Sequence, residues 1–580
     1  ATASTLSETT HATNYTSADN ATSAPSYQQQ AYDPLAGGNT SIQRASTSAT
    51  TRAASTAQAD YVPPDAGVVN VKNFGAKGDG VIDDTVAINN AIKSVDRATI
   101  YFPNGTYLVS NRLETRQPNG SFFAFKSFLG QSRDGAIIKL KNNASGYGNS
   151  GSPKAVLFTT GAGWTGLSSY PTLGTGNDAF MNNVINMTIN TGTGNLGAIG
   201  IDFLASNQGS VENVRIVSGD GQGSAGLYMG RAWPGPLMIS KLTVEGFNYG
   251  IHVENVFYHM TLENITLKNQ KIAGVYNNNN ALAVRDLVST NNVPAVRNTG
   301  AYAHVVLLDS TLSGGSSGVS AIENSSGAQL FARNIVTSGY RSAITNQGSI
   351  VPGNSVTEYV SRANTTRFPS PAQSMNLPIL ETPEYTNSNP ADWANVVSYG
   401  ATPGPDVNTA AGGYDSAAIQ AAIDSGKPVV YLPRGRYDLN STIKLRGNVR
   451  KIIGFGAILA GSVSGPGVRT ENLKSDFVII EGLRIRYGAS VSVEHASPTM
   501  LVMKRLLDSA SLRTIAGAGP AFMQDTCCGK NTINGTKLYA RQLNIEGAPG
   551  SSVYFTNNGG EVWILGYKTD RASPLFDTKS

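Results

Sequence analysis

The chain of 580 residues has little of what several functional classes depend on. Only 14% of its residues are charged, and 44 Lys and Arg against 39 Asp and Glu leave a net charge of +5. No Lys or Arg run concentrates this surplus, so we expect no nucleic-acid partner. No apolar run reaches the roughly 18 residues that a bilayer span needs, so we expect no membrane span.

Metal and redox motifs are also scarce. The two cysteines, Cys527 and Cys528, are neighbours in the chain. Neighbouring cysteines bridge only with strain, so we expect two small buried side chains and no disulfide framework. The five histidines are scattered, and the chain has no phosphate-binding loop, no His-Glu-x-x-His and no Cys-x-x-Cys. We therefore expect neither a metal nor a cofactor.

Glycine is abundant, with 63 residues, and so are Asn, Ser and Thr, which is typical of a turn-rich β solenoid. One segment also occurs twice. Its first copy contains Val71-Lys-Asn-Phe-Gly-Ala-Lys-Gly-Asp-Gly80 and Thr99-Ile-Tyr-Phe-Pro-Asn-Gly-Thr-Tyr107, and its second contains Val396-Val-Ser-Tyr-Gly-Ala401 and Val430-Tyr-Leu-Pro-Arg-Gly-Arg-Tyr437. A repeat of this kind decides the fold and is interpreted first.

Each copy predicts a short strand, a glycine turn, a capped helix and a strand closed by Pro-x-Gly-x-Tyr. The helix caps are expected at Asp83 or Asp84 and at Asp415 or Ser416. The unit resembles the N-terminal cap of a right-handed parallel β-helix of the pectate-lyase type. Two caps predict an all-β chain of two right-handed parallel β-helices, that is, tandem pectate-lyase-like solenoids, each with a short N-terminal cap helix.

A shorter period follows the first cap. A polar residue and then alternating apolar and polar residues recur at intervals of 22 to 28 residues, with starts at Asn186, Asn213, Lys241, Asn264, Asp286, Asp309 and Asn334. Short alternating strands at this interval predict stacked β-helix coils. Asn at the coil corners suits left-handed backbone and can stack in ladders.

Composition divides the rest of the chain. Residues 1–65 are almost entirely Ala, Ser, Thr, Asn and Gln, which predicts an arm that wraps its own solenoid or lies along a neighbouring subunit as part of a homo-oligomer or filament. Residues 366–392 are proline-rich, as an interdomain linker is. The predicted domains are therefore the arm 1–65, a first β-helix 66–365, the linker 366–392 and a second β-helix 393–580.

Two carboxylates near the end of the chain suggest chemistry. Glu546 and Asp570 are 24 residues apart, about one coil, and residues one coil apart stack on one face about 4.8 Å apart. Glycosidic hydrolysis uses such a pair, one acid to protonate the leaving group and one carboxylate to handle water. The carboxyls lie about 6.5–9.5 Å apart for inversion and about 5–5.5 Å apart for retention.

The tandem caps, together with Ala540-Arg-Gln-Leu-Asn-Ile-Glu546 and Val562-Trp-Ile-Leu-Gly-Tyr-Lys-Thr569, resemble family 55 glycoside hydrolases. The resemblance covers about residues 66 to 570. It implies a secreted, exo-acting and inverting β-1,3-glucanase for laminarin-type polysaccharides, without a cofactor. It also implies an active site in the cleft between two side-by-side β-helices.

Carried over residue by residue, the resemblance implies that Asp570 is the general acid, where the family has Glu, and that Glu546 is the second acid. It places the water-positioning amide at Gln208 or its neighbour Asn207. Trp233 replaces part of a family Gly-Ser-Gly-Gly segment and is either a sugar-stacking platform or a corner packing residue. The Asp570 carboxyl reaches about 1.5 Å less than a Glu would, and Arg571 beside it favours its ionised form.

Three functions remain open. The first is a secreted hydrolase of β-1,3-glucan or a related polysaccharide, and the second is a non-catalytic structural or carbohydrate-binding protein that assembles through its arm. The third is a lyase or phage-type depolymerase that shares the cap. An N-terminal Ala1 in place of Met suits a processed protein, and we expect an extracellular or cell-surface location.

Overall fold

The computed structural model describes residues 60–115, 124–161, 177–256, 258–362, 373–405, 409–410, 412–546, 553–569 and 576–579. All but the last six residues of the predicted arm 1–65 lie outside these ranges, and so does the first part of the predicted linker, up to residue 372. Asp570 and Arg571 also lie outside the described residues.

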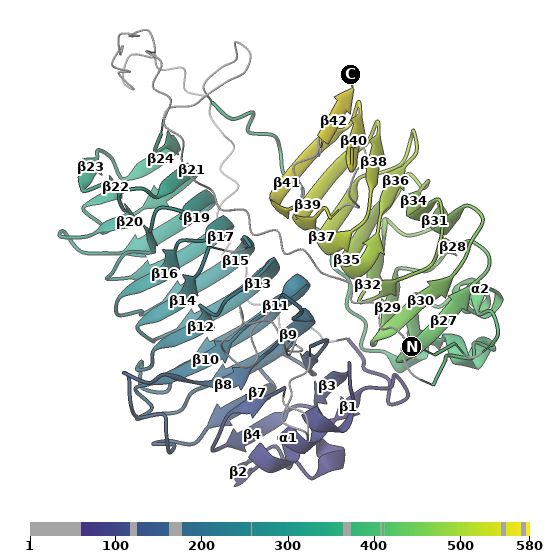
Figure 1. The fold of residues 1–580 in the computed structure, drawn as a ribbon, viewed down its shortest axis with the longest axis horizontal. Helices are drawn as coiled ribbons and strands as arrows, with labels where there is room; N and C mark the ends of the chain where they lie inside the picture. Colours follow the sequence, from purple (N-terminus) through teal and green to yellow (C-terminus); the bar gives the residue numbers. More distant parts are fainter. Residues whose placement is uncertain are drawn as a thin grey trace, which may run out of the picture. The chain divides into compact units, whose positions relative to one another are not determined.

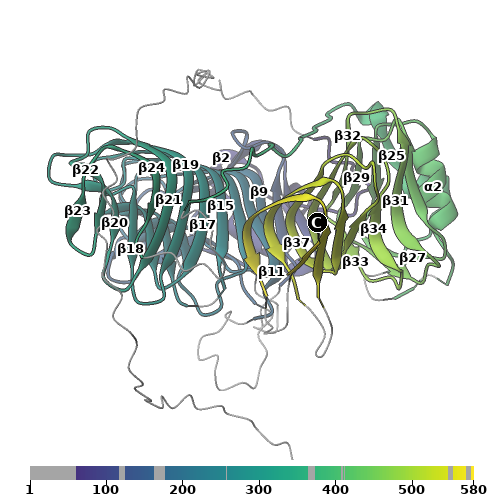
Figure 2. The ribbon, with the colours of Figure 1, turned by 90° about the horizontal axis from the view of Figure 1, so that it is seen from above.

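Both caps form as the repeat predicts. The first comprises β1 (Val69–Asn70), η1 (Val71–Phe74), β2 (Asp79–Asp83), α1 (Thr85–Ser94), β3 (Thr99–Phe102) and β4 (Gly105–Val109). The second comprises η2 (Pro390–Asp392), β25 (Trp393–Asn395), η3 (Val396–Tyr399), α2 (Ser416–Asp424), β26 (Val429–Leu432) and β27 (Gly435–Leu439). The N-caps of α1 and α2 are Asp84 and Asp415, as expected. Figure 2 shows α2 beside β25, and α2 also contacts β28.

The Pro-x-Gly-x-Tyr motif has the same physical role in both caps. The Tyr107 hydroxyl donates to the Pro103 carbonyl at 2.7 Å, and the Tyr437 hydroxyl donates to the Pro433 carbonyl at 2.9 Å. Both phenol rings are fully buried, so each hydroxyl requires a partner inside the fold. A Cβ at Gly105 would lie 2.6 Å from a backbone oxygen, which explains why the motif has glycine there.

The strands that follow the first cap form two sheets. The longer sheet also contains the cap strands, and its further members are β6 (Ser127–Gly130), β7 (Ala136–Leu140), β9 (Phe180–Asn190), β11 (Ser206–Val217), β13 (Leu237–Glu245), β15 (Met260–Lys268), β17 (Ala281–Asn291), β19 (His304–Gly314), β21 (Gln329–Thr337) and β24 (Ser355–Val360). The second sheet contains β5 (Leu113–Glu114), β8 (Lys154–Phe158), β10 (Ala198–Asp202), β12 (Ala225–Met229), β14 (Tyr249–Glu254), β16 (Ala273–Asn278), β18 (Val296–Thr299), β20 (Ser320–Asn324), β22 (Ser342–Asn346) and β23 (Ser349–Val351).

The strands that follow the second cap form a further pair of sheets. One continues from β26 and β27 with β29 (Lys451–Gly454), β30 (Ala457–Gly461), β32 (Phe477–Glu481), β33 (Arg484–Ile485), β35 (Met500–Ala510), β37 (Ala521–Cys528), β39 (Lys537–Asn544) and β41 (Glu561–Lys568). The other contains β28 (Ile443–Gly447), β31 (Pro466–Leu473), β34 (Val491–His495), β36 (Leu512–Thr514), β38 (Asn531–Asn534), β40 (Phe555–Asn558) and β42 (Phe576–Lys579).

Nearly all strand pairs are parallel, and most neighbouring strands follow one another in chain order, as β9 to β21 do in Figure 1. In the sheet that begins at β25 the order turns back at β35 to β33, β30 and β27. Only β21 with β24 and β22 with β23 are antiparallel among the described pairs. Parallel neighbours one coil apart fit a right-handed parallel β-helix. The chain is therefore an all-β solenoid, and its few helices are short; α1, with 10 residues, and α2, with 9, are its α-helices in the described ranges.

The predicted coil corners are confirmed. All seven predicted starts have a left-handed backbone, with φ between 49° and 58°: Asn186, Asn213, Lys241, Asn264, Asp286, Asp309 and Asn334. Some of these corners also form the predicted ladder, since the Asn213 amide donates to the Asn186 side-chain oxygen at 2.8 Å. Asp525 and Gln542 have the same left-handed backbone in β37 and β39.

Most of the buried apolar side chains gather in two large clusters. Buried side chains between residues 69 and 344 form one cluster, and those between residues 394 and 555 form another. Each fully buried aliphatic side chain stabilises its coil by about 1.5–3 kcal/mol. In the part of the chain that the structure describes, no helix has the length and apolar character that crossing a membrane requires.

Candidate active site

The strands before and after residue 373 contact each other through polar side chains, and we call this contact the seam. Its hydrogen-bonded and ion pairs join β11 and β15 on one side to β35, β37, β39 and Glu546, just after β39, on the other. They are Asn207 with Glu546, Gln208 with Asp525, Glu212 with Lys504 and Arg505, Thr261 with Gln542, and Glu263 with Arg541. Residues about 300 positions apart in the sequence therefore meet here.

Glu546 lies at one end of the seam, just after β39. Its side chain is 25% exposed, and its Oε1 atom accepts from the Asn544 amide at 3.1 Å and pairs with the Lys568 ammonium. Its Oε2 atom accepts from the Asn207 amide at 3.3 Å. The carboxylate is thus fixed by one cation and two amides while part of it faces solvent.

Asn207 and Gln208 are brought to the seam by an irregularity in β11. The register between β9 and β11 shifts between Ser206 and Gly209, and Asn207 has a φ of 59°. The Asn207 side chain reaches Glu546, while the Gln208 side chain is fully buried and donates to Asp525. The predicted pair therefore lies at the site, with Asn207 rather than Gln208 touching the candidate carboxylate.

Asp525 is the acid that holds Gln208. It also accepts from the Gly209 backbone amide at 3.3 Å, and its side chain is fully inside the protein. Burial raises the pKa of Asp525 to about 7, although the bonds from Gln208 and Gly209 and the nearby Arg505 act in the opposite direction. The Gln208 Oε1 atom has no hydrogen-bond partner among the described residues.

Two aromatic rings are linked to Glu546 through Lys568. The Lys568 ammonium, which pairs with Glu546, lies 4.8 Å from the Tyr258 ring centre, and Trp233 lies against Tyr258 with ring centroids 5.5 Å apart. Trp233 and Tyr258 are both half-buried. An aromatic face suits a sugar ring, which offers C–H bonds on one face and hydroxyls at its edge.

The register of the last strands agrees with the predicted one-coil offset. Asn544 of β39 pairs with Lys568 of β41, 24 positions later, which is the offset between Glu546 and Asp570. Lys568 is buried. The pKa of the neighbouring His259 is lowered to about 4, mainly by the burial of His259 and in smaller part by the charge of Lys568. Because Asp570 lies outside the described residues, its place relative to Glu546 stays a prediction.

The two cysteines are joined by a disulfide, a point that the sequence left open. Cys527 is buried as predicted, whereas Cys528 is only half-buried. The Asn544 amide that binds Glu546 also donates to the Cys527 sulfur at 3.1 Å. The two adjacent Sγ atoms fall on the same side of the chain at the end of β37, which a sequence cannot show.

Four residues of the site were not predicted: Asn544, Lys568, Tyr258 and Asp525. Lys568 and Asn544 stand two residues before the predicted acids Asp570 and Glu546 in the sequence, and residues two apart share a face wherever the chain is an extended strand. That spacing could have indicated both of them. Asp525 and Tyr258 reach the site through contacts across the seam and between coils, and no local pattern marks them.

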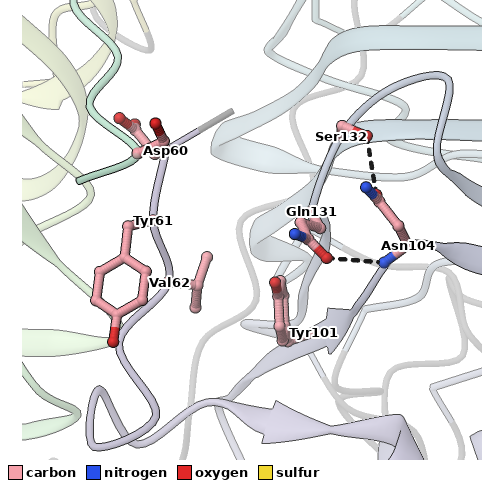
Figure 3. A pocket seen from close by; sticks show the side chains of 8 residues that line it. Asp60, Tyr61, Val62, Tyr101, Asn104, Gln131 and Ser132 are labelled. Carbon is pink, nitrogen blue, oxygen red and sulfur yellow. Dashed lines mark hydrogen bonds between the residues drawn. The ribbon is translucent and has the colours of Figure 1, made fainter. Parts of the chain in front are cut away.

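A separate hollow of about 370 Å³ lies where the chain enters the first cap. Figure 3 shows its lining, which includes Asp60, Tyr101, Asn104 and Gln131. Both Asp60 oxygens are occupied, one by the Asn387 backbone amide at 2.8 Å and the other by the Lys451 ammonium at 2.6 Å. Asp60 is the one acid among the described residues that line this hollow, so its lining does not supply the pair of carboxylates that glycosidic hydrolysis uses.

Comparison with known proteins agrees with this fold. Residues 68–299 match the family described as rhamnogalacturonase A/epimerase, pectate lyase-like, so this part of the chain is similar to pectate-lyase-like domains. A probable glucan endo-1,3-beta-glucosidase of Arthroderma benhamiae is 29% identical over 338 residues, covering 53% of this chain and 36% of that protein.

Two further relatives match over shorter lengths. A glucan 1,3-beta-glucosidase of Cochliobolus carbonum is 26% identical over 222 residues, covering 35% of this chain and 25% of that protein. A non-secreted LysM effector, LysM15, of Penicillium expansum is 32% identical over 220 residues, covering 35% of this chain and 14% of that protein. This chain thus spans about a third or less of the length of these relatives.

Proposed function

We propose that this chain is a polysaccharide-acting glycoside hydrolase whose substrate is a β-1,3-glucan or a related glucan. The observation that carries the proposal is Glu546, a part-exposed carboxylate fixed by Lys568, Asn207 and Asn544, whose Lys568 partner also lies over the Tyr258 ring. Two relatives named as glucan 1,3-β-glucosidases support the substrate class.

In the proposed mechanism Asp570 protonates the glycosidic oxygen and Glu546 takes a proton from the attacking water. Water attack from the opposite face would invert the anomeric carbon. Glu546 suits the second role because an ammonium and two amide donors hold it as an acceptor. Asn207 would share in binding the water, and Gln208, tied to Asp525, would hold the irregular turn that carries Asn207.

The architecture that we propose comprises two separate right-handed β-helices, residues 66–365 and 393–580, joined by the linker 366–392. In its support, the two groups of strands have their own sheets and their own apolar clusters. A glucan would then lie at the part-exposed end of the seam, at Glu546. The arm 1–65, an extracellular location and assembly into oligomers also remain proposals.

The test is release of reducing sugar from laminarin by the wild type and by Asp570→Ala. We expect release by the wild type, loss with Asp570→Ala, and an inverted anomer as the first product seen by proton NMR. A wild type that releases no sugar from laminarin or from a wider panel of glucans would contradict the proposal.

A second candidate function is a non-catalytic glucan-binding protein. It is favoured by Asp570, which replaces the Glu that the resembled family uses as its acid, because a misplacement of about 1 Å can reduce a rate about a hundredfold. Laminarin binding without hydrolysis, with binding weakened by Trp233→Ala, would support this alternative.

A further inference from the structure

Three soft or anionic donor groups converge beside the proposed catalytic carboxylate. The Sγ atoms of Cys527 and Cys528 and a carboxylate oxygen of Glu546 all lie within 4.8 Å of one another. Around a zinc ion, bonds of about 2.3 Å to sulfur and about 2.0–2.2 Å to oxygen place neighbouring ligand atoms within this span. The two cysteines are bonded to each other, so the sulfurs are not free to ligate in this state.

We propose that reduction of the Cys527–Cys528 disulfide opens a site for a thiophilic divalent cation such as Zn²⁺ or Cd²⁺, with both cysteines and Glu546 as its protein ligands. The site is closed while the disulfide is intact. The ion would bind the Glu546 carboxylate that the proposed hydrolysis needs. The redox state of Cys527 and Cys528 would therefore control whether a metal can block Glu546.

The redox step needs only a small dithiol as reductant. The dithiol gives two electrons and two protons, the sulfur–sulfur bond breaks, two cysteine thiols form, and the reductant closes to its own cyclic disulfide. On binding, the divalent cation displaces both thiol protons, which pass to solvent, and two thiolates and one carboxylate then surround the ion.

Exposure and supporting contacts favour this site. Cys528 and Glu546 are half-buried, so small reductants and ions can reach the cluster, while Cys527 is 1% exposed and held in β37. The Asn544 amide links the parts, donating to the Cys527 sulfur at 3.1 Å and to Glu546 at 3.1 Å. Its own oxygen is buried without a hydrogen-bond partner among the described residues and can serve a thiol or a ligand water.

Adjacent cysteines in an extended strand would ordinarily point to opposite faces. Here the backbone at the end of β37 brings both sulfurs to one side, since they are bonded to each other and both lie near the Asn544 amide. Reduction therefore leaves two thiols that already share a face with the carboxylate. A vicinal dithiol of this kind suits soft divalent metals and not Mg²⁺ or Ca²⁺.

The test is a titration of the full chain with Cd²⁺, once as isolated and once after treatment with dithiothreitol and its removal without air. The probe is the ultraviolet absorbance of the charge-transfer band that forms when a thiolate binds cadmium. We expect no signal from the oxidised protein and a signal that saturates at one Cd²⁺ per chain in the reduced protein. Binding of Mg²⁺ in place of Cd²⁺ should leave the absorbance unchanged.

Variants assign the ligands. Cys527→Ser should abolish the signal, and Glu546→Gln should weaken Cd²⁺ binding by about tenfold or more, the size of effect that changes around metal sites produce. Glu561→Gln is the matched control, because Glu561 is an exposed acid of β41 whose side chain pairs with Lys537 at 3.1 Å. The comparison of oxidised with reduced wild type needs no substitution and stands even if a cysteine variant fails to fold.

A reduced wild type that gives no signal would overturn the inference, and so would Glu546→Gln that binds Cd²⁺ as tightly as the wild type. The readout is absorbance and does not depend on hydrolysis. If the protein binds Cd²⁺ but does not cleave laminarin, that result would contradict the proposed function alone and would still support the metal site.

Discussion

Lys568 and Glu546 form an ion pair between adjacent coils, at the ends of β41 and β39, and the Lys568 side chain is only 3% exposed. The same ammonium lies over the Tyr258 ring. One buried cation thus connects the proposed water-handling carboxylate to the aromatic pair at the site's edge. Its removal should affect both catalysis and substrate placement.

We predict that Lys568→Met lowers kcat/KM on laminarin by about tenfold to a hundredfold, because a hydrogen bond to a charged group is worth about 1.5–3 kcal/mol. The control is Lys537→Met, which removes an exposed lysine of β39 paired with Glu561 at 3.1 Å. Steady-state kinetics check both variants. Equal activity of Lys568→Met and the wild type would show that the pair does not orient Glu546.

The buried charge network of the seam should carry much of the contact between its two sides. Arg505 binds Glu212 with one nitrogen and Glu481 with another, and all three side chains are about nine-tenths buried. Arg505→Met would break two buried ion pairs and leave Glu212 with Lys504 and Glu481 with Lys451 as their remaining cations, and we expect a loss of about 3–5 kcal/mol in the free energy of unfolding.

Urea denaturation measures this loss, with Arg446→Met as the control, because Arg446 is exposed and pairs with Asp424 at the surface. The control should keep the wild-type midpoint. An Arg505→Met midpoint equal to that of the control would mean that the network adds nothing to stability.

The pH dependence of stability should report Glu212. Burial alone would raise its pKa, but Lys504 and Arg505 outweigh burial and lower the pKa of Glu212 from 4.5 to about 2. A depressed carboxyl pKa stabilises the fold fully above pH 4.5, and this stabilisation is lost as the pH falls towards 2. Thermal melting from pH 6 to pH 2 should therefore show a steeper decline for the wild type than for Glu212→Gln; parallel curves would contradict the assignment.

The two caps offer a matched pair of substitutions. Tyr107→Phe and Tyr437→Phe each remove one hydroxyl and leave one proline carbonyl without its donor. We expect each variant to lose about 1–2 kcal/mol of stability, and the two losses to be similar. Chemical denaturation would detect the loss, and a variant as stable as the wild type would show that its motif has another purpose.

The sequence predicted those features that a local pattern encodes. The Pro-x-Gly-x-Tyr motif needs its tyrosine four residues after the proline, and the coil corners need Asn, Asp or Lys with a left-handed backbone, so both are visible in the chain. Glu546 could be recognised in the sequence as a candidate site residue because it stands at the end of a predicted strand motif. Its place beside Asn207 followed only from the resemblance to a family.

Contacts across the seam could not be predicted in the same way. Gln208 and Asp525 are 317 positions apart, and neither residue has a neighbour in sequence that marks the other. The Cys527–Cys528 disulfide depends on local backbone geometry that alternation rules do not give. Both pairings depend on three-dimensional geometry. The Gln208–Asp525 contact depends on how coils face each other, and the disulfide depends on the local backbone at the end of β37.

The central claim is that Glu546 serves hydrolysis at the seam, and it is tested most directly by the rate of reducing-sugar release from laminarin. The variants are Glu546→Gln, which keeps the side-chain shape, and Glu561→Gln, which removes an exposed acid from β41. We predict a loss of at least about a hundredfold for Glu546→Gln, the lower range for removal of a general base, and no change for Glu561→Gln. Undiminished release by Glu546→Gln would contradict the account.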